Sequence, residues 1–140
     1  MQPWIIYSLL SAIFAALVAI LGKIGIQNID STLATTVRAF IMAGFLFLTV
    51  LFSGKLPLLG TIQSGPLLFI VLSGIAGAIS WLFYFLALKQ GTATGVAALD
   101  RLSIVFVLIF SLLFLGQKLT WKAGLGATLM AIGAILMTLQ

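Results

Sequence analysis

The sequence contains no cysteine, no histidine and no glutamate, and its only acidic residues are Asp30 and Asp100. Without these side chains the protein cannot form a disulfide, a thiolate or imidazole metal site, or a Cys- or His-based nucleophile system. Two aspartates with no other acid leave too little chemistry for an active site. We therefore expect a protein that is not an enzyme and that holds no metal or other cofactor.

Charged residues are scarce as well, at 6% of the 140 residues, whereas 63% are hydrophobic. Soluble proteins carry about 25% charged residues. The mean hydropathy here is +1.33, so the composition indicates an integral membrane protein surrounded by membrane lipids. The net charge of +5 comes from single basic residues scattered along the chain. A nucleic-acid-binding protein would gather such residues on one face, and nucleic acid is therefore not an expected partner.

Five apolar segments each have about the 20 residues that a transmembrane helix needs. They cover residues 4–22, 33–52, 66–88, 92–115 and 121–139. The runs are too long for barrel strands and do not alternate as such strands must. The first segment lacks a basic region before it and is longer than the apolar core of a signal peptide, so we expect a retained span and not a signal peptide. We predict an all-α integral membrane protein with five transmembrane helices in one domain, residues 1–140.

Five spans would place the two termini on opposite sides of the membrane, and the basic residues hardly favour either side. Orientation normally follows a clear Lys/Arg asymmetry. One interpretation is a single orientation set by a weak bias. The other is dual topology, in which copies insert both ways and form an antiparallel homodimer, which supplies from two chains the inverted repeat that many transporters carry in one. The N-terminal side would hold Lys55, Lys118 and Lys122, and the other side Lys23 and Lys89, with Arg38 and Arg101 if they are counted there.

Asp100 and Arg101 are adjacent inside the fourth apolar segment. An ionisable side chain near the middle of a membrane costs roughly 2.5–3.5 kcal/mol on insertion scales. Such residues persist when they are paired, hydrated or used. Consecutive helical residues point about 100° apart, so these two cannot share a face, and Ser103 continues the face of Asp100. Arg38 lies in the second segment at a similar expected depth.

The charges inside the spans have several interpretations. Asp100 could form a structural ion pair with Arg38 or Arg101, because buried charges are normally paired. Alternatively, Asp100 would be a water-accessible proton or cation site, and the arginines would hold an anionic group or adjust its proton affinity. The arginines could also extend to the lipid headgroups.

The third segment has small and aromatic residues on one helical stripe, namely Gly74, Gly77, Trp81 and Tyr84. Glycines that face aromatic rings predict a slot suited to an amphipathic or cationic solute. Aromatic residues near a helix end are also typical of the membrane interface. The interface is the alternative for Tyr84, whereas Trp81 lies deeper and is the better candidate for a cavity.

Residues 81–97, with the sequence WLFYFLALKQGTATGVA, resemble EamA-like domains of the drug/metabolite transporter superfamily. The segments LDRLS at 99–103 and FLGQKLT at 114–120 share this resemblance, which covers essentially the whole chain. It implies one five-helix module, half of a ten-helix transporter in which two modules are fused in inverted orientation. Gln117 stands where family members commonly have a glutamate, so no role is carried over to that position.

The resemblance implies export or exchange of small metabolites or drugs, often coupled to protons, across the bacterial cytoplasmic (inner) membrane. We predict a multi-pass small-solute transporter that works as a homodimer or with a homologous module. A non-transporting subunit or regulator of another complex, and a component that translocates lipid-linked sugars, are the alternatives. The predicted substrate or coupling residues are Asp100, Arg101, Arg38, Trp81, Tyr84 and Ser103.

Overall fold

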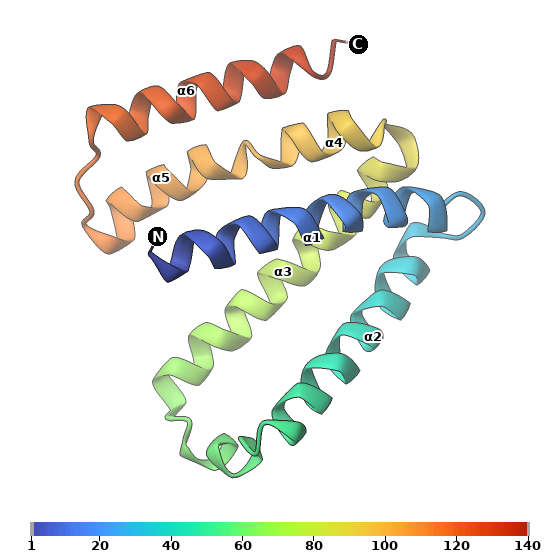
Figure 1. The fold of residues 1–140 in the computed structure, drawn as a ribbon, viewed down its shortest axis with the longest axis vertical. Helices are drawn as coiled ribbons and strands as arrows, with labels where there is room; N and C mark the ends of the chain where they lie inside the picture. Colours follow the sequence, from blue (N-terminus) through green and yellow to red (C-terminus); the bar gives the residue numbers. More distant parts are fainter. Residues whose placement is uncertain (1, 140) are drawn as a thin grey trace. The chain divides into compact units, whose positions relative to one another are not determined.

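The computed structural model describes residues 2–139, and every regular element in them is a helix (Figure 1). The helices are α1 (Pro3–Gly25), α2 (Ser31–Phe52), the 3-10 helix η1 (Leu56–Thr61), α3 (Ser64–Gln90), α4 (Ala93–Asp100), α5 (Ser103–Leu115) and α6 (Trp121–Leu136). The chain divides into two compact units. The hairpin unit is Gly25–Lys89, and the terminal unit contains the residues up to Ile24 and those from Gln90 onward.

Within residues 2–139, four stretches are long and apolar enough to cross a membrane: α1, α2, α3 and the run Ala93–Leu115 that contains α4 and α5. The predicted all-helical, multi-pass membrane fold is therefore confirmed. The predicted count of five transmembrane helices is not confirmed, because α6 has only 16 residues. A helix of that length measures about 24 Å, against about 30 Å for the hydrocarbon core. It ends at Leu136, before the predicted end at residue 139.

Local polar contacts fix the end of the hairpin unit where α2 begins. The Asp30 carboxylate accepts hydrogen bonds from the amides of Thr32 at 2.9 Å and Leu33 at 3.0 Å, which caps α2. Lys89, at the end of α3, donates to the carbonyl of Ile29 at 3.0 Å. The Leu33 amide, with further contributions from the Thr32 amide and the Lys89 charge, lowers the pKa of Asp30 below its ordinary value of 3.8.

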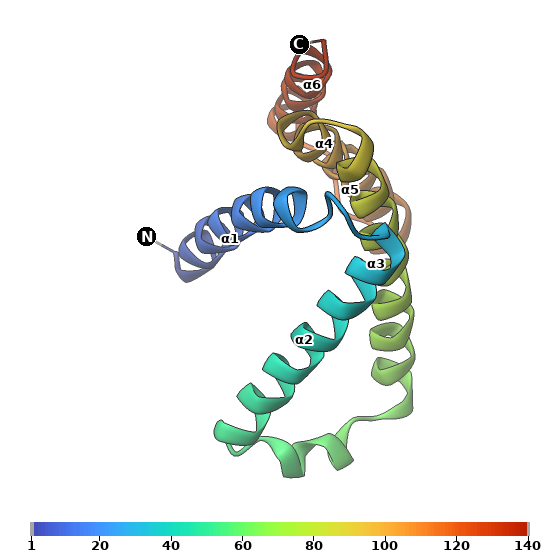
Figure 2. The same ribbon diagram turned by 90° about the vertical axis from the view of Figure 1, so that its right-hand side faces the viewer.

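The helices α2 and α3 converge at this end and diverge toward η1 (Figures 1 and 2). The buried residues of the hairpin unit all belong to the convergent end: Ile26, Ser31, Thr35, Phe85 and Leu88. Beyond them α3 carries Gly74 and Gly77, which have no side chains to fill the widening gap. A Cβ atom added to either glycine would have no other atom within 4 Å. The sequence therefore leaves an open space directly next to a closed helix contact.

In the terminal unit, α6 packs along α4 and α5 and buries Ala127 and Ala134 (Figure 1). Lys23 near the end of α1 donates to the carbonyl of Gly91, just before α4, at 2.7 Å. Thr92 then caps α4, because its hydroxyl oxygen accepts from the Gly95 amide at 3.2 Å. The loop before α4 is thus held by one lysine and one threonine.

The predicted fourth helix, residues 92–115, is not continuous, because a tightened turn follows Asp100 and separates α4 from α5. The backbone stays right-handed, with φ −67° and ψ −13° at Arg101. Hydrogen bonds to the carbonyl three residues back replace the α-helical spacing, which is the 3-10 pattern. The donors, over 2.9–3.1 Å, are the amides of Arg101, Leu102, Ile104 and Val105. Hydropathy and helical periodicity are almost unchanged by such a turn, and the sequence patterns therefore missed it.

Two glycine-to-alanine substitutions test the α4 cap. Gly126→Ala on α6 adds a methyl group to open space and should raise stability by about 0.5–1 kcal/mol, since alanine is the better helix former. At Gly95 the added Cβ would lie 2.9 Å from the Thr92 hydroxyl oxygen, so Gly95→Ala should lose the cap and show no gain or a lower melting temperature. Thermal unfolding in detergent measures both variants, and equal gains would contradict this account of Gly95.

Candidate functional site

The hairpin unit places a charged residue against an aromatic ring inside the membrane-spanning segments. The Arg38 guanidinium carbon lies 3.6 Å from the centre of the Trp81 ring, which is close enough for a cation–π contact. Arg38 precedes the end of α2 by 14 residues and Trp81 follows the beginning of α3 by 17. At about 1.5 Å per residue, the two side chains are therefore at similar heights on antiparallel helices, far from the loop that joins them.

Two further rings of α3 surround this contact. Phe85 is buried, and the centre of its ring lies 5.6 Å from the Arg38 guanidinium carbon. Tyr84 meets Trp81 edge to face, with ring centres 5.3 Å apart. The geometry is a favourable one for aromatic pairs. Tyr84 belongs to this group through its ring contact with Trp81, although it does not line the cavity described next.

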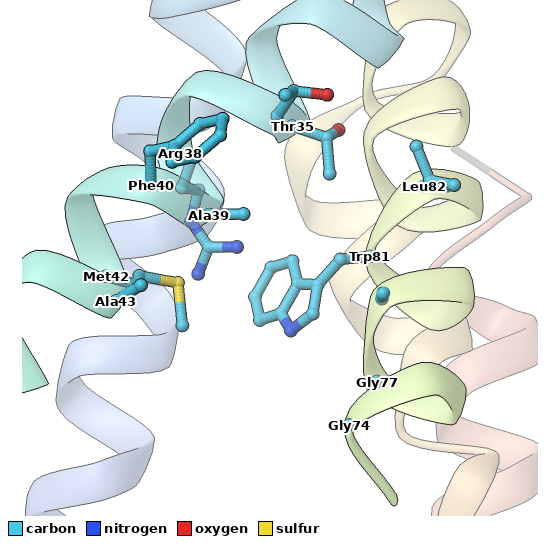
Figure 3. A pocket seen from close by; sticks show the side chains of 12 residues that line it. Thr35, Arg38, Ala39, Phe40, Met42, Ala43, Gly74, Gly77, Trp81 and Leu82 are labelled. Carbon is cyan, nitrogen blue, oxygen red and sulfur yellow. The ribbon is translucent and has the colours of Figure 1, made fainter. Parts of the chain in front are cut away.

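A cavity of about 650 Å³ opens between α2 and α3 beside Arg38 and Trp81, and most of its lining residues lie between these two and η1. Figure 3 shows the guanidinium and the indole projecting from opposite helices toward each other at its edge. The other lining residues are mostly apolar, and Gly74 and Gly77 have no side chains to occupy space on the α3 side. The residues that line it are Thr35, Thr36, Arg38, Ala39, Phe40, Met42, Ala43, Gly74, Gly77, Ala78, Trp81 and Leu82.

Arg38 has no acidic partner in the hairpin unit. Asp30 is the only acid of that unit; it lies eight residues earlier on the same helix, about 12 Å away along the axis. Its contacts are the cap and Lys89. Within the hairpin unit, Arg38 makes no hydrogen bond or ion pair, and its contacts there are with rings. A guanidinium stays charged at any physiological pH, so this wall of the cavity is permanently positive.

The other predicted site residues lie in the terminal unit, at the tightened turn between α4 and α5. Asp100 ends α4 and Ser103 begins α5, with Arg101 in the turn between them. All three side chains are exposed. No ion pair joins Asp100 to Arg101 within the described chain, so that structural pairing is not observed. Arg38 and Asp100 belong to different units, and a pairing between them remains a prediction.

The structure thus brings Arg38, Trp81 and Tyr84 together in one unit, and Asp100, Arg101 and Ser103 together in the other. The Arg38–Trp81 contact was not predicted from the sequence, although a signal for it exists. Residues 53–63, which include η1, join α2 and α3 into an antiparallel hairpin, and Arg38 and Trp81 are at similar distances in sequence from that connection. Among residues 2–139 there is no group of three or more His, Cys, Asp or Glu side chains that could bind a metal ion.

Comparison with known proteins identifies the kind of molecule that carries this geometry. The profile of the EamA-like transporter family matches residues 2–139. The chain belongs to the EamA-like transporter family. A Sinorhizobium protein described as "Uncharacterized transporter in cobO 3'region" is 44% identical over 136 residues, which are 97% of this chain and 96% of that protein. No solved structure matches the chain.

The family match confirms the resemblance that the sequence predicted. A cavity among membrane-spanning helices is consistent with a transporter family. The two sequences align over nearly the full length of both.

Replacement of Arg38 by methionine distinguishes a binding role from a structural one. Arg38→Met removes a cation–π contact worth up to about 2 kcal/mol, but also an arginine whose insertion costs roughly 2.5–3.5 kcal/mol. We therefore expect the EamA-like protein to melt in detergent at the same or a higher temperature after this change. Lys55→Met is the control, because Lys55 is exposed at the η1 end and its loss should change stability by less than about 0.5 kcal/mol. A fall of several degrees for Arg38→Met alone would make Arg38 a structural anchor.

Proposed function

We propose that the protein is a small-solute transporter of the bacterial cytoplasmic membrane and that the cavity of the hairpin unit binds the solute. The observation that carries the proposal is Arg38 held over Trp81 on the wall of an apolar cavity of about 650 Å³. Small-molecule sites usually measure about 300–1,000 Å³, with a few polar groups in apolar walls. An arginine at this depth without an acidic partner contributes little to folding. Ionisable residues within membrane spans commonly mark substrate or ion sites, and a binding role accounts for Arg38 in this way.

Asp100 is the residue that we propose for coupling to protons. It is the only acid inside the spans, it is exposed and it has no ion pair within the described chain. It also precedes a 3-10 turn inside an otherwise regular helix, and such turns often mark hinges. Interrupted helices are common at the binding and coupling sites of transporters. Protonation of Asp100 would remove a charge beside a turn that can change its geometry, with Arg101 and Ser103 as its immediate polar neighbours.

We further propose that two five-helix modules form the working transporter, either as an antiparallel homodimer or with a homologous module. Two observations support an assembly. The Lys/Arg distribution is nearly even between the two sides, and the α2–α3 cavity is a gap on one side of a hairpin and so needs another surface to close it. In this proposal α6 crosses the membrane as the fifth span, with residues 137–139 extending its 16 helical residues.

Currents from proteoliposomes test the transport function with several chemical classes of solute. The purified protein is placed on a solid-supported membrane and exposed in turn to amino acids, organic carboxylates, nucleosides and organic cations. We expect a protein-dependent current with at least one class, and at least about a tenfold smaller proton-coupled current in Asp100→Asn, because the amide cannot exchange a proton. Asp30→Asn is the matched control, since asparagine also caps helices well.

Two results would contradict parts of this proposal. If no class of solute gives more current than empty liposomes, the protein is not a transporter of these solutes, and the transport function fails. If Asp100→Asn carries the same proton-coupled current as the parent protein, Asp100 is not the coupling residue, although transport stands.

Reporters at both ends of the chain test the topology. Two reporter enzymes are used, one active only in the cytoplasm and one active only in the periplasm. Each is fused to the N-terminus in one set of proteins and to the C-terminus in another. Five spans with dual topology should give activity from both reporters at both ends, since the near-even Lys/Arg distribution does not fix an orientation. If only one of the two reporters is active at each terminus, the protein has a single orientation and dual topology is contradicted. If that active reporter is the same at both termini, the termini lie on the same side of the membrane, which would indicate four spans.

A further inference from the structure

We propose that the cavity of the hairpin unit is selective for an amphipathic organic monoanion, a carboxylate attached to an aromatic or other apolar body. This inference rests on the proposed transport function for its physiological meaning, but ligand selection can be measured separately. Three features of the cavity support it: the sign of its charge, the direction of its hydrogen-bonding groups and the nature of its walls.

The charge of the cavity is a single positive one. Among the lining residues Arg38 is the only ionisable side chain. The single acid of the hairpin unit, Asp30, is bound to the cap of α2. A bound cation would add to an uncompensated positive charge, and a dianion would leave one negative charge in apolar surroundings. One carboxylate balances the guanidinium, and the paired charges at membrane depth then cost less than Arg38 alone.

The polar groups of the cavity donate hydrogen bonds and leave no strong acceptor. The hydroxyl groups of Thr35 and Thr36 donate to carbonyls of their own helix, those of Ser31 at 2.7 Å and Thr32 at 2.8 Å. The donors that remain are the guanidinium N–H groups of Arg38 and the indole N–H of Trp81, which Figure 3 shows at the cavity. The two threonine oxygens keep lone pairs and can accept, but they are neutral, whereas the guanidinium donors are charged. A carboxylate is the ligand group that best satisfies charged donors, because its two oxygens match the geometry of a guanidinium fork.

The cation–π contact still leaves donors available. The Arg38 guanidinium carbon lies over the Trp81 ring, 3.6 Å from its centre, and a guanidinium has five N–H groups. Arg38 is thus held in place by Trp81, and the N–H groups that do not face the ring remain able to bind an anion. The same contact argues against a cationic solute, one of the two classes that the aromatic stripe suggested, because Arg38 already covers the ring face such a solute would use.

The walls select an apolar body for the anion. Phe40, Met42 and Leu82 line the cavity, and the positions of Gly74 and Gly77 leave open space on α3. A flat apolar group could lie against these glycines with its carboxylate at Arg38. An inorganic anion would contact the charge of Arg38 but would leave the apolar lining of the cavity in contact with water. It should therefore bind more weakly than a carboxylate with an apolar body.

Three probes that share one body and differ in charge test this selectivity. They are 4-(4-nitrophenyl)butyrate, its neutral amide and the corresponding butylammonium ion. The protein has three tryptophans, so replacement of the exposed Trp4 and Trp121 by phenylalanine leaves Trp81 as the fluorescent reporter. The nitrophenyl group quenches that emission when it lies close to the indole. We expect the anion to half-saturate quenching at a concentration at least about tenfold below that of the amide or the cation, since a charged pair strengthens a hydrogen bond about twofold and adds charge balance.

Variants then assign the preference to Arg38. Arg38→Gln should abolish the difference between the anion and the amide, and Arg38→Lys should keep part of it, because lysine retains the charge but not the fork. Lys55→Gln removes a positive charge outside the cavity and should leave the preference intact. Equal quenching by all three probes, a preference for the cation, or an anion preference that survives Arg38→Gln would overturn the inference. If Arg38→Gln does not fold, the probe comparison on the parent protein and on Arg38→Lys decides the matter.

A lipid phosphate is the competing source of an anion at Arg38. The titrations are therefore repeated in nanodiscs of phosphatidylcholine, with and without anionic phosphatidylglycerol. A carboxylate site should keep its preference for the butyrate probe in both, whereas loss of that preference in phosphatidylglycerol would overturn the inference in favour of a lipid. The transport assay fails separately: anion-selective quenching without current refutes transport alone, and current without anion selectivity refutes the ligand class alone.

Discussion

The binding chemistry of the hairpin unit depends on one interaction, the contact between the Arg38 guanidinium and the Trp81 ring. An arginine in an apolar helix needs a partner that tolerates a positive charge, and the hairpin unit offers no acid at that height. A ring face supplies part of what water would have given. For the ring to reach the arginine, α2 and α3 must come close at one end, which Asp30, Lys89 and the buried Phe85 and Leu88 secure. Beyond that end nothing requires the helices to stay together, and the cavity lies there.

In the same arrangement the glycines of α3 leave space for a cavity and do not serve close packing between helices. Small residues three or four apart in a membrane helix lie on one face and commonly permit close contact with a neighbour. Gly74 and Gly77 instead have open space where a side chain would begin. Small residues contribute here by what they leave empty, whereas Ala127 and Ala134 on α6 are buried and do serve packing. The two uses cannot be told apart by spacing, because spacing fixes the face of a helix and not what that face meets.

Features that depend on composition or on local chemistry could be predicted from the sequence, and features that depend on how helices meet could not. The helical membrane class follows from long apolar runs, and the caps at Asp30, Thr92 and Thr120 follow from their side chains. The turn after Asp100 escaped prediction because one turn of 3-10 spacing leaves hydropathy unchanged. The length of α6 was overestimated because apolar residues continue past the last helical turn at Leu136. Arg38, Trp81 and Tyr84 were chosen singly from the sequence, but only the fold shows that they form one group.

A stable membrane protein and a functional one make different demands on charged residues, and the difference is visible here. Lys23 and Lys89 lie at helix ends and bind backbone carbonyls at 2.7 and 3.0 Å, which satisfies groups that would otherwise lack partners. Such lysines hold the fold together. Arg38 and Asp100 lie within the spans, and neither has an ion pair within the described chain. Natural sequences give up stability chiefly where function requires it. The charges that do least for folding are therefore the ones on which the activity of this EamA-like protein should depend.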